Sequence, residues 1–398
     1  MTITGPWRRT AAGAGLLDTG GAIRPTIFAE MTALAAETGA INLGQGFPDE
    51  DGPAEVVEAA REAIAAGVNQ YPPGRGMAVL REAIAAHQGR FYGIGADPET
   101  EVLVTAGATE AIAATLLALL EPGDELLTLE PFYDEYGAIA ALAGAQHRTV
   151  RLRWPDFTPD PEEFAAAVTD RTRIILLNNP HNPCGTVLSA DFLRVVVEAA
   201  ERHDAIIVTD EVYEHLTFGV PHVPVASLPG AAGRTVTISS GGKTFSATGW
   251  KIGWAIARPE LIEAILAVKQ FLTYVNGAPF QPAIAAGLAL PRERFDAFAA
   301  ELGAKRDLLR GALLEAGFPV SRPDGSYFLI ADAAALGYED AATLCRALPA
   351  LAGVVAVPVT AFCSPEHAPE YGSLLRFAYC KRRDVLEEAA HRLAAARS

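Results

Sequence analysis

Short runs of aliphatic and β-branched residues alternate with helix-length segments between residues 100 and 257, and this alternation restricts the possible folds more than any other feature. Val102–Thr105 has the composition of a buried strand, and an apolar-faced helix is predicted for Thr109–Leu120. Further strands are predicted at 126–129, 147–152, 173–177, 205–209, 234–238 and 253–257. Continuously apolar strands separated by helices are typical of a mainly parallel sheet with helices on both faces. The expected fold class is therefore α/β.

The two ends of the chain do not continue this alternation. We predict an N-terminal arm and part of a smaller α+β domain in residues 1–48, a large domain in residues 49–294, and the rest of the smaller domain in residues 295–398. In parallel sheets, ligands bind beyond the carboxyl ends of the strands. The residues that directly follow predicted strands are therefore the first candidates for a functional site.

Charge and cysteine pattern limit the partners and the compartment. The net charge of −16 argues against nucleic acid or an anionic membrane as a general partner. The four cysteines are scattered, without a C-x-x-C pair, so neither a disulfide framework nor a metal site is predicted. We find no apolar stretch typical of a signal peptide or a membrane span, and expect a cytoplasmic protein.

Lys243 lies in a Gly-Gly-Lys-Thr string that follows the predicted strand at 234–238. This string resembles half of a phosphate-binding P-loop, which also requires a glycine five residues before Gly242. That position is Thr237, and the nucleotide interpretation therefore fails. An isolated lysine in a turn is usually only an exposed charge. Whether Lys243 has a function therefore depends on the residues that follow the other strands.

Asp210 directly follows the predicted strand at 205–209, and Tyr213 comes three residues later. A carboxylate and a phenol side by side could hold a heteroaromatic ring, one at its nitrogen and the other at its phenolic oxygen. An aspartate in this position can equally be a simple helix cap. Gly107-Ala108-Thr109 stands where a strand meets a helix, and free N–H groups there could bind a phosphate.

The segment from Asn178 to Gly185 contains two Asn-Pro bonds directly after the predicted strand at 173–177. Such bonds can be cis, and the resulting loop could direct Asn182 inward or could be an ordinary turn. His181 is a weak metal candidate because no second ligand stands at a useful spacing.

Together these motifs resemble the fold type I (class I and II) aminotransferases of pyridoxal phosphate. Within that family the chain is similar to the branch of kynurenine/glutamine transaminases and N-succinyldiaminopimelate aminotransferases. The resemblance runs from about Phe28 to the C-terminus. It is carried by motifs at residues 41–48, 69–71, 130–133, 178–185, 209–213, 243–253 and 375–377. It implies a seven-stranded sheet and a homodimer with shared active sites.

The resemblance implies specific roles around the pyridine ring of the cofactor. Lys243 would hold the cofactor as a Schiff base and then move the proton from the substrate Cα. Asp210 would keep the pyridine nitrogen protonated. Asn182 and Tyr213 would form hydrogen bonds with the phenolic oxygen, and Tyr133 would stack on the ring.

The resemblance also implies phosphate-binding and substrate-binding residues. The phosphate would be held by Gly107, Ala108, Thr109, Ser240, Lys251 and Tyr71 of the partner subunit. The substrate would be bound by Phe28, Gly46, Asn182, Arg376 and Tyr274 of the partner subunit. Arg376 would bind the α-carboxylate through two parallel hydrogen bonds.

The activity implied is ping-pong transfer of an amino group from an amino acid to a 2-oxo acid. The preferred pair is N-succinyl-LL-2,6-diaminopimelate and 2-oxoglutarate, in lysine biosynthesis. The alternative is a kynurenine, glutamine or methionine transaminase, with β-lyase side activity on cysteine conjugates. Kynurenine enzymes commonly carry histidine after an aromatic residue where this chain has Tyr274-Val275, and this departure weakens an aromatic substrate.

Two other classes of protein with this fold are alternatives to an active aminotransferase. A ligand-sensing regulator of this fold carries a basic DNA-binding module first, and the acidic chain has about 25 residues before the resemblance begins. A pseudoenzyme is disfavoured because Lys243, Asp210 and Arg376 are all present.

Overall fold

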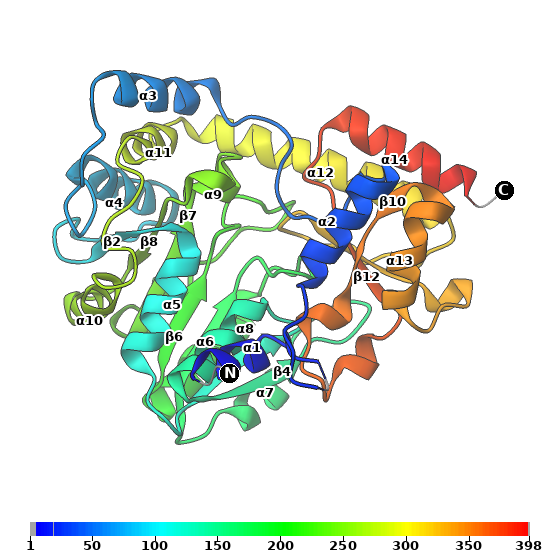
Figure 1. The fold of residues 1–398 in the computed structure, drawn as a ribbon. Helices are drawn as coiled ribbons and strands as arrows, with labels where there is room; N and C mark the ends of the chain where they lie inside the picture. Colours follow the sequence, from blue (N-terminus) through cyan, green and yellow to red (C-terminus); the bar gives the residue numbers. More distant parts are fainter. Residues whose placement is uncertain (1–4, 19, 397–398) are drawn as a thin grey trace.

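The computed structural model describes residues 5–18 and 20–396, and its centre is a seven-stranded sheet (Figure 1). The strands lie in the order β2 (Val102–Thr105), β8 (Gly253–Ile256), β7 (Thr235–Ser240), β6 (Ile206–Asp210), β5 (Thr172–Asn178), β3 (Glu125–Glu130) and β4 (Gln146–Arg151). Only β8 runs antiparallel to its neighbours in this sheet. All the predicted strands form, and the mainly parallel α/β sheet is confirmed.

Helices cover both faces of the sheet, which explains why its strands are apolar without alternation. One face is covered by α5 (Gly107–Leu119), α6 (Asp134–Ala143) and α10 (Pro259–Lys269), and the other by α7 (Pro161–Ala167) and α8 (Ala190–Arg202). On β5, Ile174 and Leu176 pack on the first face, and Ile175 and Leu177 pack on the second. Helix α8 begins as predicted, since the Ser189 hydroxyl accepts a hydrogen bond from the Phe192 N–H.

The remaining helices lie beside the β2–β8 edge of the sheet or connect it to the C-terminal part. Close to this edge are α3 (Ala54–Ala65), α4 (Ala78–Tyr92) and α11 (Phe280–Leu288). The short α9 (Gly241–Thr244) follows β7 directly. The short 3-10 helices are η1 (Val225–Ser227), η2 (Ala232–Arg234), η3 (Thr248–Trp250), η4 (Ala334–Leu336), η5 (Val359–Phe362) and η6 (Ala368–Tyr371). Across the described residues, none of the helices combines the length and the apolar character needed to cross a membrane.

A separate hydrophobic core joins an N-terminal segment to the C-terminal third of the chain. Its strands are β1 (Ile41–Asn42) with β10 (Val354–Val355), and β11 (Val357–Pro358), β12 (Leu374–Ala378) and β9 (Phe328–Asp332). Its helices are α2 (Ile27–Thr38), α12 (Arg292–Glu315), α13 (Ala341–Ala352) and α14 (Arg383–Ala395). Figure 1 shows α2 (blue) among these C-terminal elements. The domain limits at residues 48 and 295 stay a prediction, and residue 295 lies inside α12.

The N-terminal arm packs on the large sheet region through α1 (Trp7–Gly13). Gly13 crosses α6 at Gly137, and a Cβ on Gly13 would lie 2.4 Å from the Gly137 carbonyl oxygen. Only glycine permits an approach this close. The arm therefore contacts the helix that follows Tyr133. Residues 1–4 of the predicted arm lie outside the described residues.

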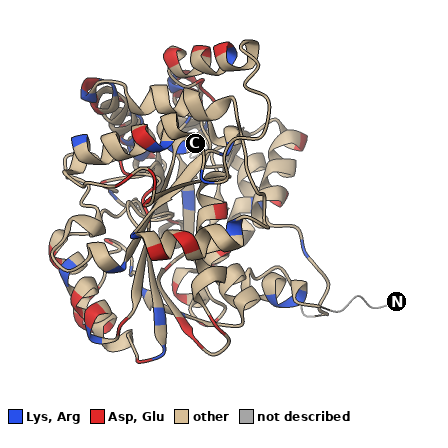
Figure 2. Cartoon of the chain, turned by 90° about the vertical axis from the view of Figure 1, so that its left-hand side faces the viewer, with Lys and Arg blue, Asp and Glu red and all other residues tan. Residues whose placement is uncertain are grey.

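In the view of Figure 2, positions of basic and acidic residues are interspersed along the outer helices. Several of these residues form local ion pairs. One example is Arg346 with Glu30, which connects α13 to α2 at 2.6 Å. Exposed pairs of this kind each contribute little to stability.

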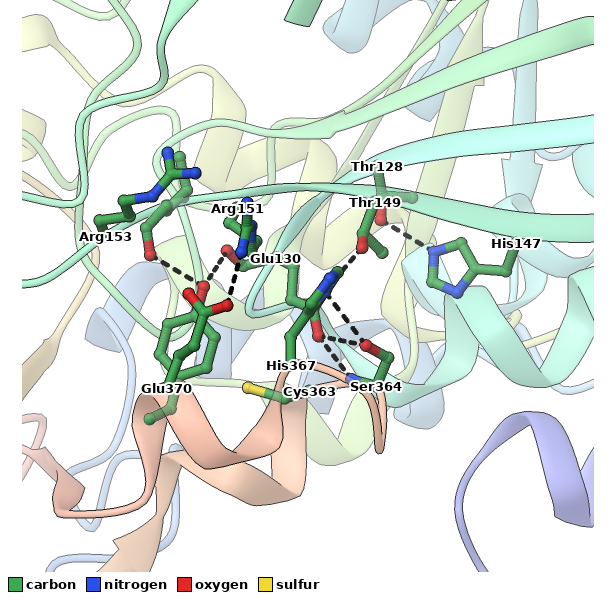
Figure 3. Close-up of polar contacts among 12 residues, drawn as sticks. Thr128, Glu130, His147, Thr149, Arg151, Arg153, Cys363, Ser364, His367 and Glu370 are labelled. Atoms are coloured by element: carbon green, nitrogen blue, oxygen red, sulfur yellow. Dashed lines mark hydrogen bonds and ion pairs between the residues drawn. The ribbon is translucent and has the colours of Figure 1, made fainter. Parts of the chain in front are cut away.

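A buried carboxylate at the end of β3 connects the sheet to the segment between η5 and η6 (Figure 3). Glu130 accepts hydrogen bonds from the Thr149 hydroxyl at 2.5 Å and from the Ser364 hydroxyl at 2.8 Å. His367 Nδ1 lies 2.6 Å from the same carboxylate. In a hydrolase triad, the serine and the carboxylate contact different nitrogens of the histidine. Here Ser364 and Glu130 both contact Nδ1 of His367, so the three residues do not form such a triad. Its role is structural.

Replacing Glu130 by alanine should lower the free energy of unfolding by about 2–4 kcal/mol, because several buried donors would lose their acceptor. The midpoint of urea-induced unfolding measures this. Glu370→Ala is the matched control, since Glu370 binds Arg151 in the same region but is half exposed. Equal effects of the two substitutions would contradict a structural role for the buried carboxylate.

Candidate active site

The carboxyl ends of three neighbouring strands line one cavity, with an empty volume of about 780 Å³. Asn178 ends β5, Asp210 ends β6 and Ser240 ends β7, and Lys243 follows on α9. All predicted cofactor residues except Tyr71 line this cavity: Gly107, Ala108, Thr109, Tyr133, Asn182, Asp210, Tyr213, Ser240, Lys243 and Lys251. Residues separated by more than 130 positions in the sequence thus meet where parallel strands end.

Asp210 is buried at the base of the cavity, 6 % exposed. The Tyr136 hydroxyl donates a hydrogen bond to its Oδ2 at 2.8 Å, and the Val212 N–H donates to Oδ1 at 3.4 Å. Burial outweighs these bonds and raises the pKa of Asp210 to about 6. This carboxylate is therefore costly to ionise alone and would gain from a cationic partner.

Lys243 projects into the same cavity from α9. Its Nζ lies 3.4 Å from the Gly46 carbonyl oxygen and 5.9 Å from the centre of the Tyr213 ring. Burial lowers the pKa of the Lys243 amine below its ordinary value. A lysine in this environment more readily provides the neutral amine that acts as nucleophile or base.

Close packing around α9 explains why the two residues before Lys243 are glycines. A Cβ on Gly241 would lie 2.6 Å from the Ile284 Cδ1, so a larger residue would push α9 away from α11. A Cβ on Gly242 would lie 3.1 Å from the Thr248 Cα. The Gly-Gly pair thus allows close packing around α9 and does not bind a nucleotide phosphate.

The opposite end of the cavity is suited to an anion. Helix α5 begins at Gly107, and the first N–H groups of a helix have no partner within it. Lys251 Nζ lies 3.2 Å from the Thr109 hydroxyl, and a Cβ on Gly107 would lie 3.1 Å from that Nζ. Both Gly107 and Lys251 have positive φ angles, +75° and +53°. Helix dipole, ammonium and hydroxyl converge here as in a phosphate site.

Arg376 on β12 is buried, 2 % exposed, and lies near the Asn-Pro loop. It donates hydrogen bonds to the Asn182 Oδ1 at 2.9 Å and to the Gly44 carbonyl oxygen at 2.7 Å, while its Nε has no hydrogen-bond partner among the described residues. Burial lowers the pKa of Arg376 to about 10. A buried guanidinium with a free donor is suited to binding a carboxylate.

Aromatic rings surround Arg376 and the space beside Gly46. The guanidinium carbon lies 5.5 Å from the Phe28 ring centre and 4.1 Å from that of Phe328. A Cβ on Gly46 would lie 2.6 Å from the Phe328 ring. Of the predicted substrate residues, Asn182 lines the cavity, and Phe28, Gly46 and Arg376 lie next to it. Phe28 also lines a neighbouring cavity.

The structure places Tyr71 and Tyr274 away from the cavity of their own chain. Tyr71 is 82 % exposed and Tyr274 is 42 % exposed, and their ring centres lie 5.6 Å apart. Their predicted contact with a partner subunit stays a prediction.

Three residues of the site were missed by the sequence analysis. Tyr136 follows Tyr133 by one helical turn on α6, and this spacing could have revealed it. Glu135 lines the cavity with both carboxylate oxygens buried and unpartnered, and burial raises its pKa well above the ordinary value. Tyr327 donates to the Gly46 carbonyl oxygen at 2.6 Å, and no local sequence signal identifies it.

In the ligand-free protein, Asp210→Asn should be more stable than the wild type, and this difference should increase as pH rises. The raised pKa of Asp210 means that the folded state holds the proton more tightly, so stability present below the ordinary pKa of 3.8 is lost as pH rises through about 6. Asparagine avoids this loss, and its advantage should grow by roughly 2–3 kcal/mol between pH 4 and pH 7. Unfolding midpoints across this range measure the effect, with the exposed Asp156→Asn as control. A pH-independent difference would contradict the assigned burial cost.

Comparison with known proteins identifies the family. The model for aminotransferase class I and II matches residues 38–393. A protein of Mycobacterium tuberculosis named "Probable N-succinyldiaminopimelate aminotransferase DapC" is 53% identical over 378 residues, covering 92% of this chain and 95% of that protein. Methionine aminotransferase of Escherichia coli is 39% identical over 369 residues, covering 92% and 95%. The solved structure of the M. tuberculosis N-succinyldiaminopimelate aminotransferase has a TM-score of 0.92 and 50% identity, covering 99% and 100%. The chain therefore belongs to the class I and II aminotransferases and is an enzyme of amino-group transfer.

Proposed function

We propose that the chain is a pyridoxal-phosphate-dependent N-succinyldiaminopimelate:2-oxoglutarate aminotransferase of lysine biosynthesis. The observation that carries the choice of substrate is the 53% identity, over nearly the whole of both chains, to a protein named for that activity. The identity to a methionine aminotransferase is lower, at 39% over a similar length.

The residues of the cavity fit pyridoxal phosphate. Asp210 is a buried carboxylate that a protonated pyridine nitrogen would stabilise, and Tyr136 holds it in place. Lys251 and the first turn of α5 supply positive charge and free N–H groups for the phosphate. Tyr133 lies at the cavity wall to cover the ring. When bound, the cofactor supplies an electron sink for the negative charge that develops at the substrate Cα.

Lys243 carries the proton in this proposal. Burial lowers its pKa, and its Nζ lies within the cavity that the substrate Cα would share. Burial raises the pKa of the Tyr213 phenol, which therefore remains a hydrogen-bond donor toward the cofactor oxygen. Asn182 lies between the proposed cofactor and the proposed substrate site, because it lines the cavity and its side-chain oxygen accepts a hydrogen bond from Arg376. Its backbone N–H donates to Asn178 Oδ1 at 2.6 Å, which fixes the loop.

Arg376 orients the substrate. Both an amino acid donor and a 2-oxo acid acceptor carry a carboxylate next to the reacting carbon, so one arginine can serve both half-reactions. The surrounding rings of Phe28 and Phe328 exclude water, which strengthens the charge pair. The exposed Tyr71 and Tyr274 would reach the cavity of a partner subunit in a homodimer.

Lys243→Ala should abolish the visible absorbance of the lysine-bound cofactor and lower kcat by about 10³-fold or more. The other lysine that lines the cavity, Lys251, has its amine beside Thr109 at the phosphate end. Absorbance spectra and turnover measure both effects. Lys251→Ala is the matched control, which should keep the absorbance at saturating cofactor but weaken cofactor affinity. Normal turnover by Lys243→Ala would contradict the assignment.

A panel of donors should separate the proposed substrate from the alternatives. With 2-oxoglutarate as acceptor, kcat/KM for N-succinyl-LL-2,6-diaminopimelate should exceed that for methionine, glutamine and kynurenine by about 10-fold or more, as expected when a site is built to pair with the extra polar group. Glutamate formation measures each rate. Preference for methionine or kynurenine would overturn the choice of substrate but leave the aminotransferase intact.

A further inference from the structure

A second buried polar cluster lies outside the active-site cavity. His87 comes from α4, and Glu214 and His215 come from the turn after β6. Their exposed fractions are 2 %, 4 % and 9 %. One side-chain nitrogen or oxygen from each residue lies within 4.8 Å of those of the other two. The cluster therefore brings two imidazoles and a carboxylate to one point.

The contacts within this cluster leave buried atoms without a partner. His87 Nε2 and His215 Nε2 lie 2.8 Å apart, and the Ser239 hydroxyl donates to Glu214 Oε1 at 2.7 Å. His87 Nδ1 and Glu214 Oε2 form no hydrogen bond of normal geometry within residues 5–18 and 20–396. The Tyr92 hydroxyl is directed at Glu214 and interacts with it, so the buried His87 Nδ1 is the clearest unpartnered atom of the cluster in the described part of the chain. Buried polar atoms nearly always have a partner, so these atoms indicate a further bound group.

The charges around the cluster favour a cation as that group. Glu211 is buried beside it and meets only His222, at 2.9 Å. In the described part of the chain, neither Glu211 nor Glu214 forms an ion pair with lysine or arginine. Two buried carboxylates without a lysine or arginine partner among the described residues favour a cation at this place.

Two arginines lie near enough to influence the histidines but are directed elsewhere. The guanidinium carbons of Arg90 and Arg292 lie 4.8 Å and 4.3 Å from the centre of the Phe91 ring. That ring packs against His87, with centres 4.6 Å apart. Arg90 donates to the Leu288 carbonyl oxygen at 2.6 Å, and Arg292 donates to the Arg90 carbonyl oxygen at 3.3 Å.

We propose that His87, Glu214 and His215 bind one divalent transition-metal ion, with zinc the best match. Two imidazoles and one carboxylate are a ligand set that zinc accepts, and a water molecule would complete four ligands. Tetrahedral ligands about 2.1 Å from zinc stand roughly 3.4 Å apart. The two Nε2 atoms lie 2.8 Å apart and would therefore need to separate by ~0.6 Å if both bind the ion.

The place of this site in the fold gives the ion a structural role. It would connect α4 to the turn that begins at Asp210 and carries Tyr213, next in sequence to Glu214. The ligands are too buried to meet a substrate. The proposal is independent of the amino donor. It also departs from the sequence analysis, which predicted no metal from the scattered cysteines and the isolated His181. His87 and His215 are 128 residues apart and give no local signal.

Metal content of the tag-free holoenzyme tests the proposal. After incubation with zinc and dialysis, elemental analysis should find about one zinc per chain. X-ray absorption at the zinc edge should show nitrogen and oxygen ligands with no sulfur. Removal by a chelator should lower Tm by several degrees, and zinc should restore it. Less than about 0.1 zinc per chain, with Tm unchanged by chelator, would overturn the proposal.

Three variants assign the zinc to this cluster. His87→Ala and Glu214→Gln should each lower the bound zinc by at least about 10-fold, as expected for loss of one of three ligands. His203→Ala, at a partly exposed histidine outside the cluster, is the control and should keep the bound zinc. Undiminished zinc in both cluster variants would place the metal elsewhere and overturn the proposal. If a variant does not fold, the absorption spectrum of the wild-type protein decides alone, since sulfur ligands would exclude this site.

Discussion

The shared direction of β5, β6 and β7 is the constraint on which the active site depends. Because their carboxyl ends lie at one edge of the sheet, Asn178 pairs in register with Asp210, and Asp210 with Ile238. The chain then leaves each strand in a loop or turn that carries a chemical group: Asn182, Tyr213 or Lys243. A slip of one residue in this register would turn these side chains to the opposite face of the sheet.

Burial of unlike charges in one cavity shapes the chemistry of this site. Removal from water raises the pKa of Asp210 and lowers the pKa values of Lys243 and Arg376, so each charged form is disfavoured in the ligand-free protein. A ligand with a cationic ring nitrogen and a carboxylate offers partners to Asp210 and Arg376. The free energy of ligand binding then offsets the cost of burying these groups.

The sequence was informative where function depends on the ends of strands. Strand ends follow from local patterns of apolar residues, so Asp210 and Lys243 could be placed before the structure was known. Arg376 has no such signal by itself, since only the packing of β12 beside the Asn-Pro loop makes it a buried group. Tyr327 is absent from any local pattern, because its hydroxyl meets Gly46 only through tertiary packing 281 residues away.

The turn from Asp210 to His215 belongs to two polar clusters at once. Asp210 and Tyr213 line the active-site cavity, while Glu214 and His215 belong to the cluster with His87, and Glu211 lies beside it. The turn is short and hydrogen-bonded, with the Glu214 N–H donating to the Glu211 carbonyl oxygen at 2.9 Å. The Ser239 side chain, one residue before the cavity residue Ser240, holds Glu214. Because Glu214 directly follows Tyr213, a metal that held the Glu214 side chain would also restrain the backbone that positions Tyr213.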